Sequence, residues 1–204
     1  MIRVAVATVL ASILATLLGG CALLRPAAEA PALPYRFTDA GTVVYREEFE
    51  FLPPPERWRF VQVEKGEEFS FAFLALGDCP RPCQSVFAYD EEPFGYSRDL
   101  RERMAEFFRR FLWAARVRFD TPVIRPVRVL GGEGLEAVAV GRDPVKPYKV
   151  RAKVVLGRRG ERVVAFYLSQ WRRADAAFDP EEVADFDRFV QSFRYRRPSF
   201  YETL

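Results

Sequence analysis

The sequence contains no histidine among its 204 residues. Without imidazole, the chain can build neither Ser-His-Asp nor Cys-His nucleophiles, and it lacks the usual metal ligand and pH switch. Cysteine is scarce as well, with three residues, so a four-cysteine zinc site is excluded. We therefore expect no catalytic residue, no metal and no cofactor.

The chain also lacks a large excess of either charge, because it contains 31 basic and 28 acidic residues. A nucleic-acid-binding domain normally carries a strong basic excess on one face, so we expect no nucleic-acid partner. Hydrophobic residues make up 50% of the chain and aromatic residues 15%, which is enough to bury a core. At this length, a single folded domain is expected.

Long apolar runs are confined to the amino terminus. Residues 1–3 give a short basic start, and residues 4–18 follow without any charge. As a helix this run spans roughly 22 Å, which is less than the roughly 30 Å hydrocarbon core of a bilayer. The pattern favours a signal peptide over residues 1–20 rather than a permanent membrane span.

Leu18-Gly19-Gly20-Cys21 resembles the lipobox of bacterial lipoproteins. In that family the cysteine thiol takes a diacylglyceryl group, and the signal is cut just before it. The resemblance implies that Cys21 is the lipid attachment residue and holds the chain to a membrane. Ala22 differs from the aspartate that resembles an inner-membrane retention signal, which favours the outer membrane, facing the periplasm. The alternative is an ordinary Cys21 thiol behind an uncleaved anchor or a standard secretory signal.

Residues 22–34 are dominated by alanine and proline and show neither a strand nor a helix pattern. An extended chain of this kind spans about 3.1 Å per residue and acts as a spacer. The predicted organisation is a signal peptide (1–20), a lipidated tether (21–34) and a single α+β domain (35–204).

The domain is expected to alternate strands with two amphipathic helices. The expected strands span 42–51, 57–64, 69–76, 85–89, 123–130, 135–140, 149–156 and 162–171. Both faces of strand 69–76 are apolar, which predicts that it is covered on both sides. The glycine-rich residues 131–134 lack the spacing of a phosphate-binding loop and are expected to form a hairpin turn.

The helices are marked by their caps. Ser97 is expected to cap the first helix, with Asp99 in its first turn, and apolar residues recur at helical spacing from Leu100 to Ala115. Asp179 and Pro180 start the second helix, whose apolar face ends at Phe193. The exposed face of the first helix carries Arg98, Arg101, Glu102, Arg109, Arg110 and Arg116 and is interpreted as solvated.

This order of elements resembles the PsbP and Mog1 superfamily. The resemblance rests on the proline-rich entry to Trp58, the strand pairs around 131–134 and 157–160, and the closing sequence 186–193. It implies a twisted antiparallel sheet of about six to eight strands flanked by helices, an α/β/α sandwich. Members are mainly accessory or binding proteins, and the resemblance supplies no active-site residue.

Cys79-Pro80-Arg81-Pro82-Cys83 places three residues between its cysteines, which fits neither a thioredoxin-like redox pair nor a zinc site. With Cys21 consumed by lipid, Cys79 and Cys83 remain as a pair, and a structural disulfide is expected in an oxidising compartment.

The acidic groups are the remaining candidates for chemistry. They are Glu47, Glu48 and Glu50; Asp90, Glu91 and Glu92; and Glu181, Glu182 and Asp185. A carboxylate enzyme needs two carboxyl groups that face one bond, and nothing in the sequence brings two together. We expect a non-enzymatic, lipid-anchored module that binds an envelope protein or polymer. The alternative is a small-ligand binder or carboxylate enzyme that uses a sheet–helix cleft.

Overall fold

The computed structural model describes residues 35–65, 68–91, 98–115 and 117–196. The predicted signal peptide, the tether and Cys21 lie outside these residues, and residues from Tyr35 onward belong to one compact unit. The elements in chain order are β1 (Tyr35–Phe37), β2 (Val43–Tyr45), β3 (Phe49–Phe51), β4 (Arg59–Lys65), β5 (Glu68–Leu76), β6 (Gln84–Glu91), α2 (Leu100–Ala115), β7 (Arg118–Phe119), β8 (Val123–Val129), β9 (Gly132–Arg142), β10 (Tyr148–Arg159), β11 (Arg162–Arg173), α3 (Pro180–Ser192) and β12 (Arg194–Tyr195).

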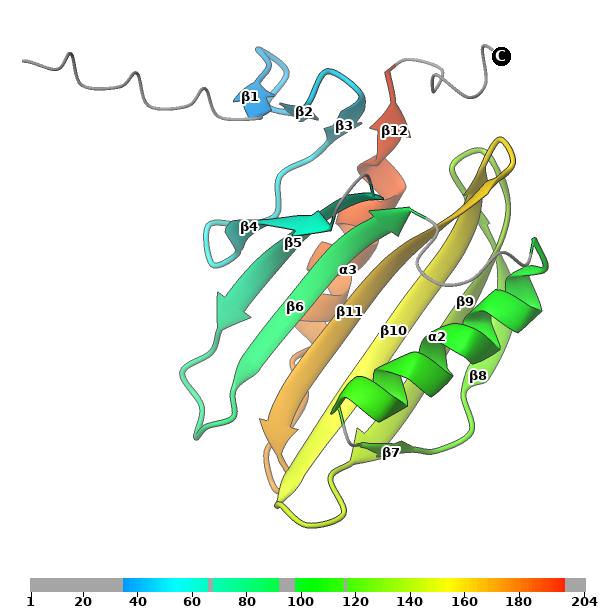
Figure 1. The fold of residues 1–204 in the computed structure, drawn as a ribbon. Coiled ribbons are helices and arrows are strands. Elements are labelled where there is room, and N and C mark those ends of the chain that lie inside the picture. The colour runs from blue at the N-terminus through cyan, green and yellow to red at the C-terminus, as the bar shows by residue number, and fades with distance from the viewer. Residues whose placement is uncertain (1–34, 66–67, 92–97, 116, 197–204) are drawn as a thin grey trace, which may run out of the picture. The chain divides into compact units, whose positions relative to one another are not determined.

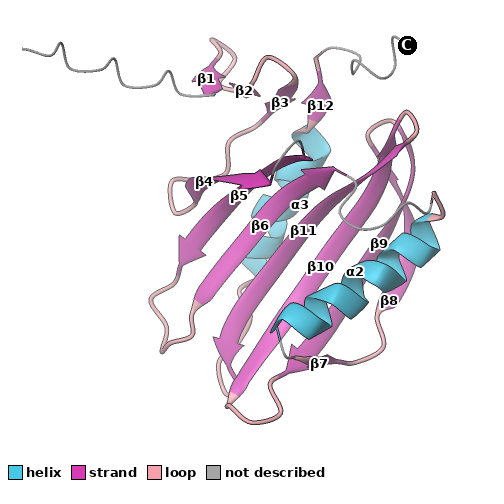
Figure 2. Ribbon diagram, viewed as in Figure 1, coloured by secondary structure: helices cyan, strands magenta, loops and turns pink. Residues whose placement is uncertain are grey.

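The unit is built on an eight-stranded antiparallel sheet in the order β4-β5-β6-β11-β10-β9-β7, with β8 also paired to β9. Helix α2 lies on one face and α3 on the other (Figures 1 and 2). The expected α+β class, with an antiparallel sheet between helices, is confirmed. All four expected strands of the second half are present and form the two expected pairs, and β9, β10 and β11 extend beyond their expected ends.

The α3 face of the sheet holds an aromatic core. Phe71, Phe87 and Phe166 are completely buried there, and the ring of Phe189 on α3 lies 5.0 Å from that of Phe87. Phe193, just after the helix, stacks on Tyr89 at 4.8 Å. Because each aromatic side chain buries a large area, this face dominates the hydrophobic stabilisation of the fold.

The α2 face is lined by smaller side chains. Ala137 and Ala152 form a floor on which the buried Met104 and Phe107 of α2 lie. Small residues on the sheet let the large helix side chains approach it closely.

A second, four-stranded sheet has the order β1-β2-β3-β12 and was not anticipated from the sequence. The expected strand 42–51 is wrong as one element, because Arg46 and Glu47 have positive φ angles of 49° and 59° and reverse the chain between β2 and β3. Two consecutive residues of this conformation form the tight turn that suits a hairpin. Strand β12 then pairs with β3 and brings the end of α3 to this sheet.

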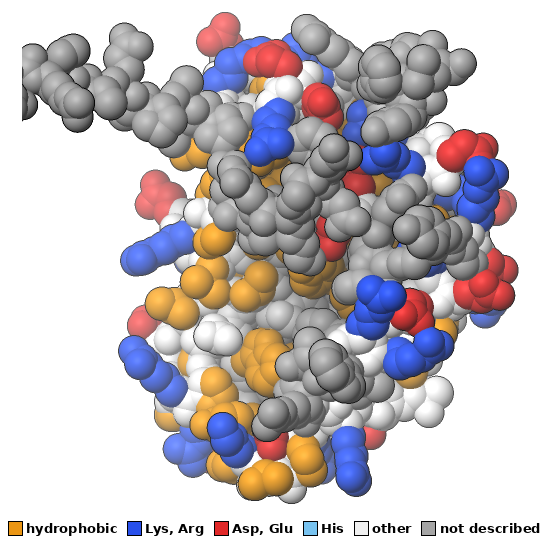
Figure 3. Space-filling model, in the orientation of Figure 1, with side chains coloured by type: hydrophobic (Ala, Val, Ile, Leu, Met, Phe, Trp, Pro, Cys, Tyr) orange, Lys and Arg blue, Asp and Glu red, His pale blue; other side chains and the backbone are white. Residues whose placement is uncertain are grey.

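Two further expectations need correction. Ser97 lies outside the described residues, and the carboxylate of Asp99 caps α2 by accepting hydrogen bonds from the backbone N–H groups of Arg101 and Glu102 at 2.6 and 3.1 Å. Strand β5 is not covered along both faces, because Leu76 is 64% exposed. Figure 3 shows apolar side chains over β4–β6, on the same face of the sheet as α2 but beyond the strands that this helix covers. A single helix is too narrow to cover eight strands.

Helix α3 begins as expected, with Asp179 as its N-cap and Pro180 in its first turn. Its buried Glu182 anchors it to the sheet. The Glu182 carboxylate accepts hydrogen bonds from Arg172 and Gln170, both at 2.7 Å, and from the hydroxyl of Ser85 at 2.5 Å. The side chains of Arg172 and Glu182 are only 3% and 6% exposed, so this ion pair lies inside the protein.

Replacing Arg172 with methionine should lower the free energy of unfolding by about 3 to 5 kcal/mol, because Glu182 would remain buried without its cation. Arg173→Met removes an exposed pair with Asp175 and should cost about 0 to 1 kcal/mol. Urea unfolding of the two variants measures both changes, and equal costs would show that Glu182 does not depend on Arg172.

Candidate functional site

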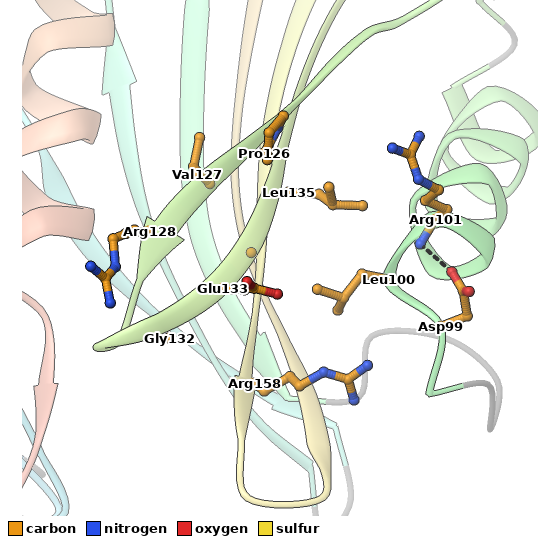
Figure 4. Close-up of a pocket in the computed structure, with 11 residues that line it drawn as sticks. Asp99, Leu100, Arg101, Pro126, Val127, Arg128, Gly132, Glu133, Leu135 and Arg158 are labelled. Atoms are coloured by element: carbon orange, nitrogen blue, oxygen red, sulfur yellow. Dashed lines mark hydrogen bonds between the residues drawn. The ribbon is translucent and has the colours of Figure 1, made fainter.

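A cleft of about 1150 Å³ lies between the start of α2 and the β8–β9 hairpin. Figure 4 shows Leu100 and Leu135 in the space between helix and sheet, with Arg101 above them and Arg158 below. The cleft is lined by Asp99, Leu100, Arg101, Pro126, Val127, Arg128, Gly132, Glu133, Gly134, Leu135 and Arg158.

The sheet wall of the cleft depends on the turn between β8 and β9. Leu130 and Gly131 both have positive φ angles, 55° and 78°, and close a two-residue hairpin. Gly134 follows at a close approach of backbones, where a Cβ would lie 2.4 Å from the carbonyl oxygen of Leu156. The expected hairpin is confirmed, but its turn is only Leu130–Gly131, and residues 132–134 belong to β9. Gly131 and Gly134 occupy positions that favour glycine.

The helix wall presents its amino-terminal end to the cleft. Free N–H groups at a helix start attract anions. Here the Asp99 carboxylate already accepts hydrogen bonds from two of them. Positive charge in the cleft therefore comes from arginine side chains rather than from the helix end.

Arg101 and Arg128 are the cations available to a ligand. Among the described residues, neither guanidinium has a carboxylate within ion-pair distance. Arg158 donates a hydrogen bond to the backbone carbonyl of Arg98. Figure 4 places Arg128 on the other side of β8, at the outer rim of the cleft.

The other described arginines of the expected solvated helix face, Arg98, Arg109 and Arg110, are neutralised. Arg98 pairs with Glu161, and Arg109 and Arg110 pair with Glu106 at 2.5 and 2.7 Å. These contacts lower the pKa of the Glu106 carboxyl, chiefly through its hydrogen bond with Arg110. Arg116 lies outside the described residues. Arg101 thus differs from its helical neighbours.

The floor of the cleft is aliphatic, and Glu133 adds one carboxylate beside it (Figure 4). No serine, threonine, tyrosine or cysteine belongs to the described lining, so the cleft contains no hydroxyl or thiol nucleophile. Guanidinium groups hold carboxylates and phosphates through paired hydrogen bonds. The arrangement is therefore suited to binding an anionic group that has an apolar neighbour.

The acidic groups named from the sequence are instead held by structural contacts. Glu47 pairs with Arg36 at 2.8 Å, and Glu50 with Arg194 at 2.6 Å. These arginines lower the pKa of both carboxyls, in each case mainly through a side-chain hydrogen bond. Glu48 lies 4.0 Å from Arg159.

The acidic group at 90–92 lies at the end of β6, and the group at 181–185 lies along α3. Glu91 is buried and accepts hydrogen bonds from Arg159 at 2.6 Å and from the hydroxyl of Tyr89 at 2.7 Å. Burial raises the pKa of Tyr89 well above its usual value. Asp185 accepts a hydrogen bond from the Trp58 indole at 2.9 Å. Glu181 pairs with Arg57 at 3.0 Å, and Glu92 lies outside the described residues.

No pair of these carboxylates faces a common cavity in the described part of the chain, and no cluster of three metal-ligating side chains occurs there. Tyr167 is not activated either, because burial and the nearby Asp90 raise its pKa to about 12. Ser192 donates a hydrogen bond to the Phe189 carbonyl at 2.9 Å and so completes a helix end.

The sequence did not identify the cleft residues Arg128, Glu133 and Arg158. The only sequence feature that pointed to them was the charge of the turn residues beside the glycines, and this charge indicated only that the turns are exposed. The cleft forms because α2 lies across the end of the β8–β9 hairpin, and this placement depends on packing between residues far apart in the sequence.

Cys79 and Cys83 form a disulfide in the structure. The loop that they close leads into β6, and the Gly77 N–H donates a hydrogen bond to the Cys83 carbonyl at 3.0 Å. A Cβ on Gly77 would lie 2.5 Å from the Cys83 sulfur, so glycine provides the room for the bridge.

Cys21, the predicted lipid site, lies outside the described residues, and no described helix is long and apolar enough to cross a membrane.

No family model matches the chain, and no curated protein matches its sequence. Among solved structures, the chain is similar to the solution structure of cyanobacterial PsbP (CyanoP) from Synechocystis sp. PCC 6803. The sequence identity is 15% and the TM-score 0.49, over 84% of this chain and 98% of that chain. This neighbour is a PsbP-like protein and supplies no residue role to the chain.

Replacing both Cys79 and Cys83 with serine should lower the free energy of unfolding by about 2 kcal/mol, because the closed loop is very short. The variant should still fold, since the aromatic core does not depend on this loop. Chemical denaturation measures the change. Thiol alkylation of the native protein without reductant should leave both residues unmodified, and their ready modification would contradict the disulfide.

Proposed function

We propose that the protein is a lipid-anchored cell-envelope protein that acts as a non-enzymatic binding or accessory module for an envelope protein or polymer. The observation that carries the binding role is the cleft between α2 and the β8–β9 hairpin, with its arginines and its aliphatic floor. In this proposal Cys21 bears the lipid, and the outer membrane, facing the periplasm, is the location.

The proposed location is supported by two independent cysteine features. The lipobox-like residues before Cys21 favour lipid attachment, and the Cys79–Cys83 disulfide is of the kind that persists in oxidising compartments. A cytosolic protein would meet reducing conditions, in which such a bridge is rare. Both features therefore favour an exported protein.

The proposed binding role is supported by how the charges of the cleft are arranged. The guanidinium groups of Arg101 and Arg128 can still donate hydrogen bonds to a ligand, whereas the Asp99 carboxylate caps the helix. An anionic group of the partner would pair with the guanidiniums, and an adjacent apolar group would cover Leu100 and Leu135. The size and openness of the cleft favour a segment of a larger partner.

The second candidate function is a small-ligand site in the same cleft, which the guanidinium of Arg101 above the aliphatic floor, unpaired among the described residues, also favours. A carboxylate enzyme would need a second available carboxyl group beside Glu133. Asp99 is the other described carboxylate of the lining, and it is engaged at the helix end. A small anion is therefore the form of this alternative that the geometry favours.

Replacing Cys21 with serine should abolish fatty-acid labelling and release the protein from the membrane fraction. Metabolic labelling with a fatty-acid analogue, followed by fractionation, measures both effects. A Cys79→Ser/Cys83→Ser variant serves as the control and should keep its label. Labelling that persists in Cys21→Ser would contradict the anchor.

A photo-crosslinking residue at Glu133 should capture one reproducible partner in cells, and Arg101→Ala/Arg128→Ala should reduce this capture at least about tenfold, because charge-assisted hydrogen bonds are lost. Arg109→Ala on the same helix, whose guanidinium pairs with Glu106, should leave it unchanged.

Equal capture by all three proteins would contradict the role of the cleft arginines. Absence of a crosslinked partner, together with a small anion that copurifies with the unsubstituted protein and is lost from the double variant, would favour the small-ligand alternative.

A further inference from the structure

A row of four cations crosses the main sheet on its α3 face. The strand register places Arg118 opposite Arg142, Arg142 opposite Lys149, and Lys149 opposite Arg172. Directly opposed residues of neighbouring strands point to the same face, about 5 Å apart. The face is that of α3, because Lys153, on the same side of β10, pairs with Asp187 of α3 at 2.5 Å.

Such a row is unfavourable for folding, since like charges that lie directly opposite destabilise a sheet. Arg172 is neutralised by Glu182. Arg118, Arg142 and Lys149 have no carboxylate within ion-pair distance among the described residues, and the same holds for Arg151, two positions along β10. The fold therefore maintains a cluster of uncompensated positive charge.

Three acidic residues at this end of the sheet are engaged elsewhere. The Asp143 carboxylate accepts hydrogen bonds from the N–H groups of Val145 and Lys146, both at 2.8 Å. Asp175 pairs with Arg173, and Asp179 caps α3. None of these contacts neutralises the row, so an external anion is the partner that would.

Phe178 adds an aromatic surface to the cluster. Its ring lies 5.1 Å from the Lys149 ammonium and 4.9 Å from the Arg151 guanidinium. These contacts hold the two side chains against the ring without using their hydrogen-bond donors. The Nε of Arg151 is buried and has no hydrogen-bond partner in the described structure.

An aliphatic pocket of about 340 Å³ adjoins Arg151. Val123, Val138 and Val183 contribute apolar walls, and Val123 is 73% exposed. The charged groups of this pocket already compensate one another, because Glu136 pairs with Arg125 at 2.7 Å and with Lys153 at 3.3 Å. The pocket is therefore suited to an apolar side chain, next to a cationic row suited to carboxylates.

We infer that this surface docks a polypeptide segment in which acidic residues accompany an aliphatic one. The name cationic row means the three members unpaired among the described residues, Arg118, Arg142 and Lys149, together with the adjacent Arg151 and without the neutralised Arg172. The aliphatic pocket favours a polypeptide over a polyanion that has no apolar side chains. The surface is separate from the α2 cleft and extends the proposed function.

The test uses the full chain, purified in detergent, and a fluorescent octapeptide of alternating glutamate and valine. Fluorescence anisotropy should show binding that weakens as salt rises. Arg142→Gln/Lys149→Gln should weaken binding at least about tenfold. The matched control is Arg109→Gln/Arg110→Gln, which removes the same charge from α2 and should bind like the unsubstituted protein.

Three further measurements decide between partners. An octapeptide with glutamine in place of glutamate should not bind, and an octamer of glutamate alone should bind at least about fivefold more weakly than the glutamate–valine peptide. Equal binding of the two glutamate peptides would overturn the aliphatic part of the proposal. Binding to vesicles of anionic phospholipid, but to neither peptide, would assign the row to a membrane and overturn the proposal.

Thermal unfolding gives an independent readout. Because the row is unfavourable for folding, Arg142→Gln/Lys149→Gln should raise the melting temperature, whereas Arg109→Gln/Arg110→Gln breaks two ion pairs and should not. A lower melting temperature in the first variant would show that the row is structural.

Discussion

The buried carboxylate of Glu182 is the contact on which the arrangement of the sheet and α3 depends. Its hydrogen bonds reach Ser85 on β6 and Gln170 and Arg172 on β11, so one side chain joins the helix to two strands. Asp185, one turn later, accepts the Trp58 indole N–H. Aromatic packing alone is non-directional and would tolerate a shift of the helix, whereas these buried acceptors require one position.

The two helices cover different parts of the sheet, and the exposed surfaces follow from that difference. Helix α3 lies over the aromatic strands and leaves the α3 face of β9 and β10 partly open, where Lys149 and Arg151 lie. Helix α2 lies over the alanine-lined strands and leaves the cleft beside Leu135. Each candidate surface is thus the part of one face that its helix does not reach.

The sequence was sufficient for elements whose signals are local. The Asp179 cap, the glycines of the β8–β9 hairpin and the apolar spacing of the helices all lie within a few residues of the structures that they produce. It was insufficient where the partner is distant. Strand β12 pairs with β3, and the opposition of Arg142 to Lys149 depends on strand register. Neither follows from periodicity, and the cleft depends on how α2 crosses β9.

The distribution of ion pairs connects the proposed function with the inferred docking surface. In a chain of nearly balanced charge, most described arginines pair with a carboxylate, and Arg36, Arg109 and Arg110 do so even at the surface. Leaving neighbouring cations unpaired adds little to the stability of a folded protein, and repulsion between like charges on adjacent strands lowers that stability. Arg118, Arg142 and Lys149 nevertheless stand opposed across three strands. A binding partner that supplies carboxylates would remove this repulsion, but only in the complex. Selection for binding would therefore retain a row of charges that destabilises the free protein.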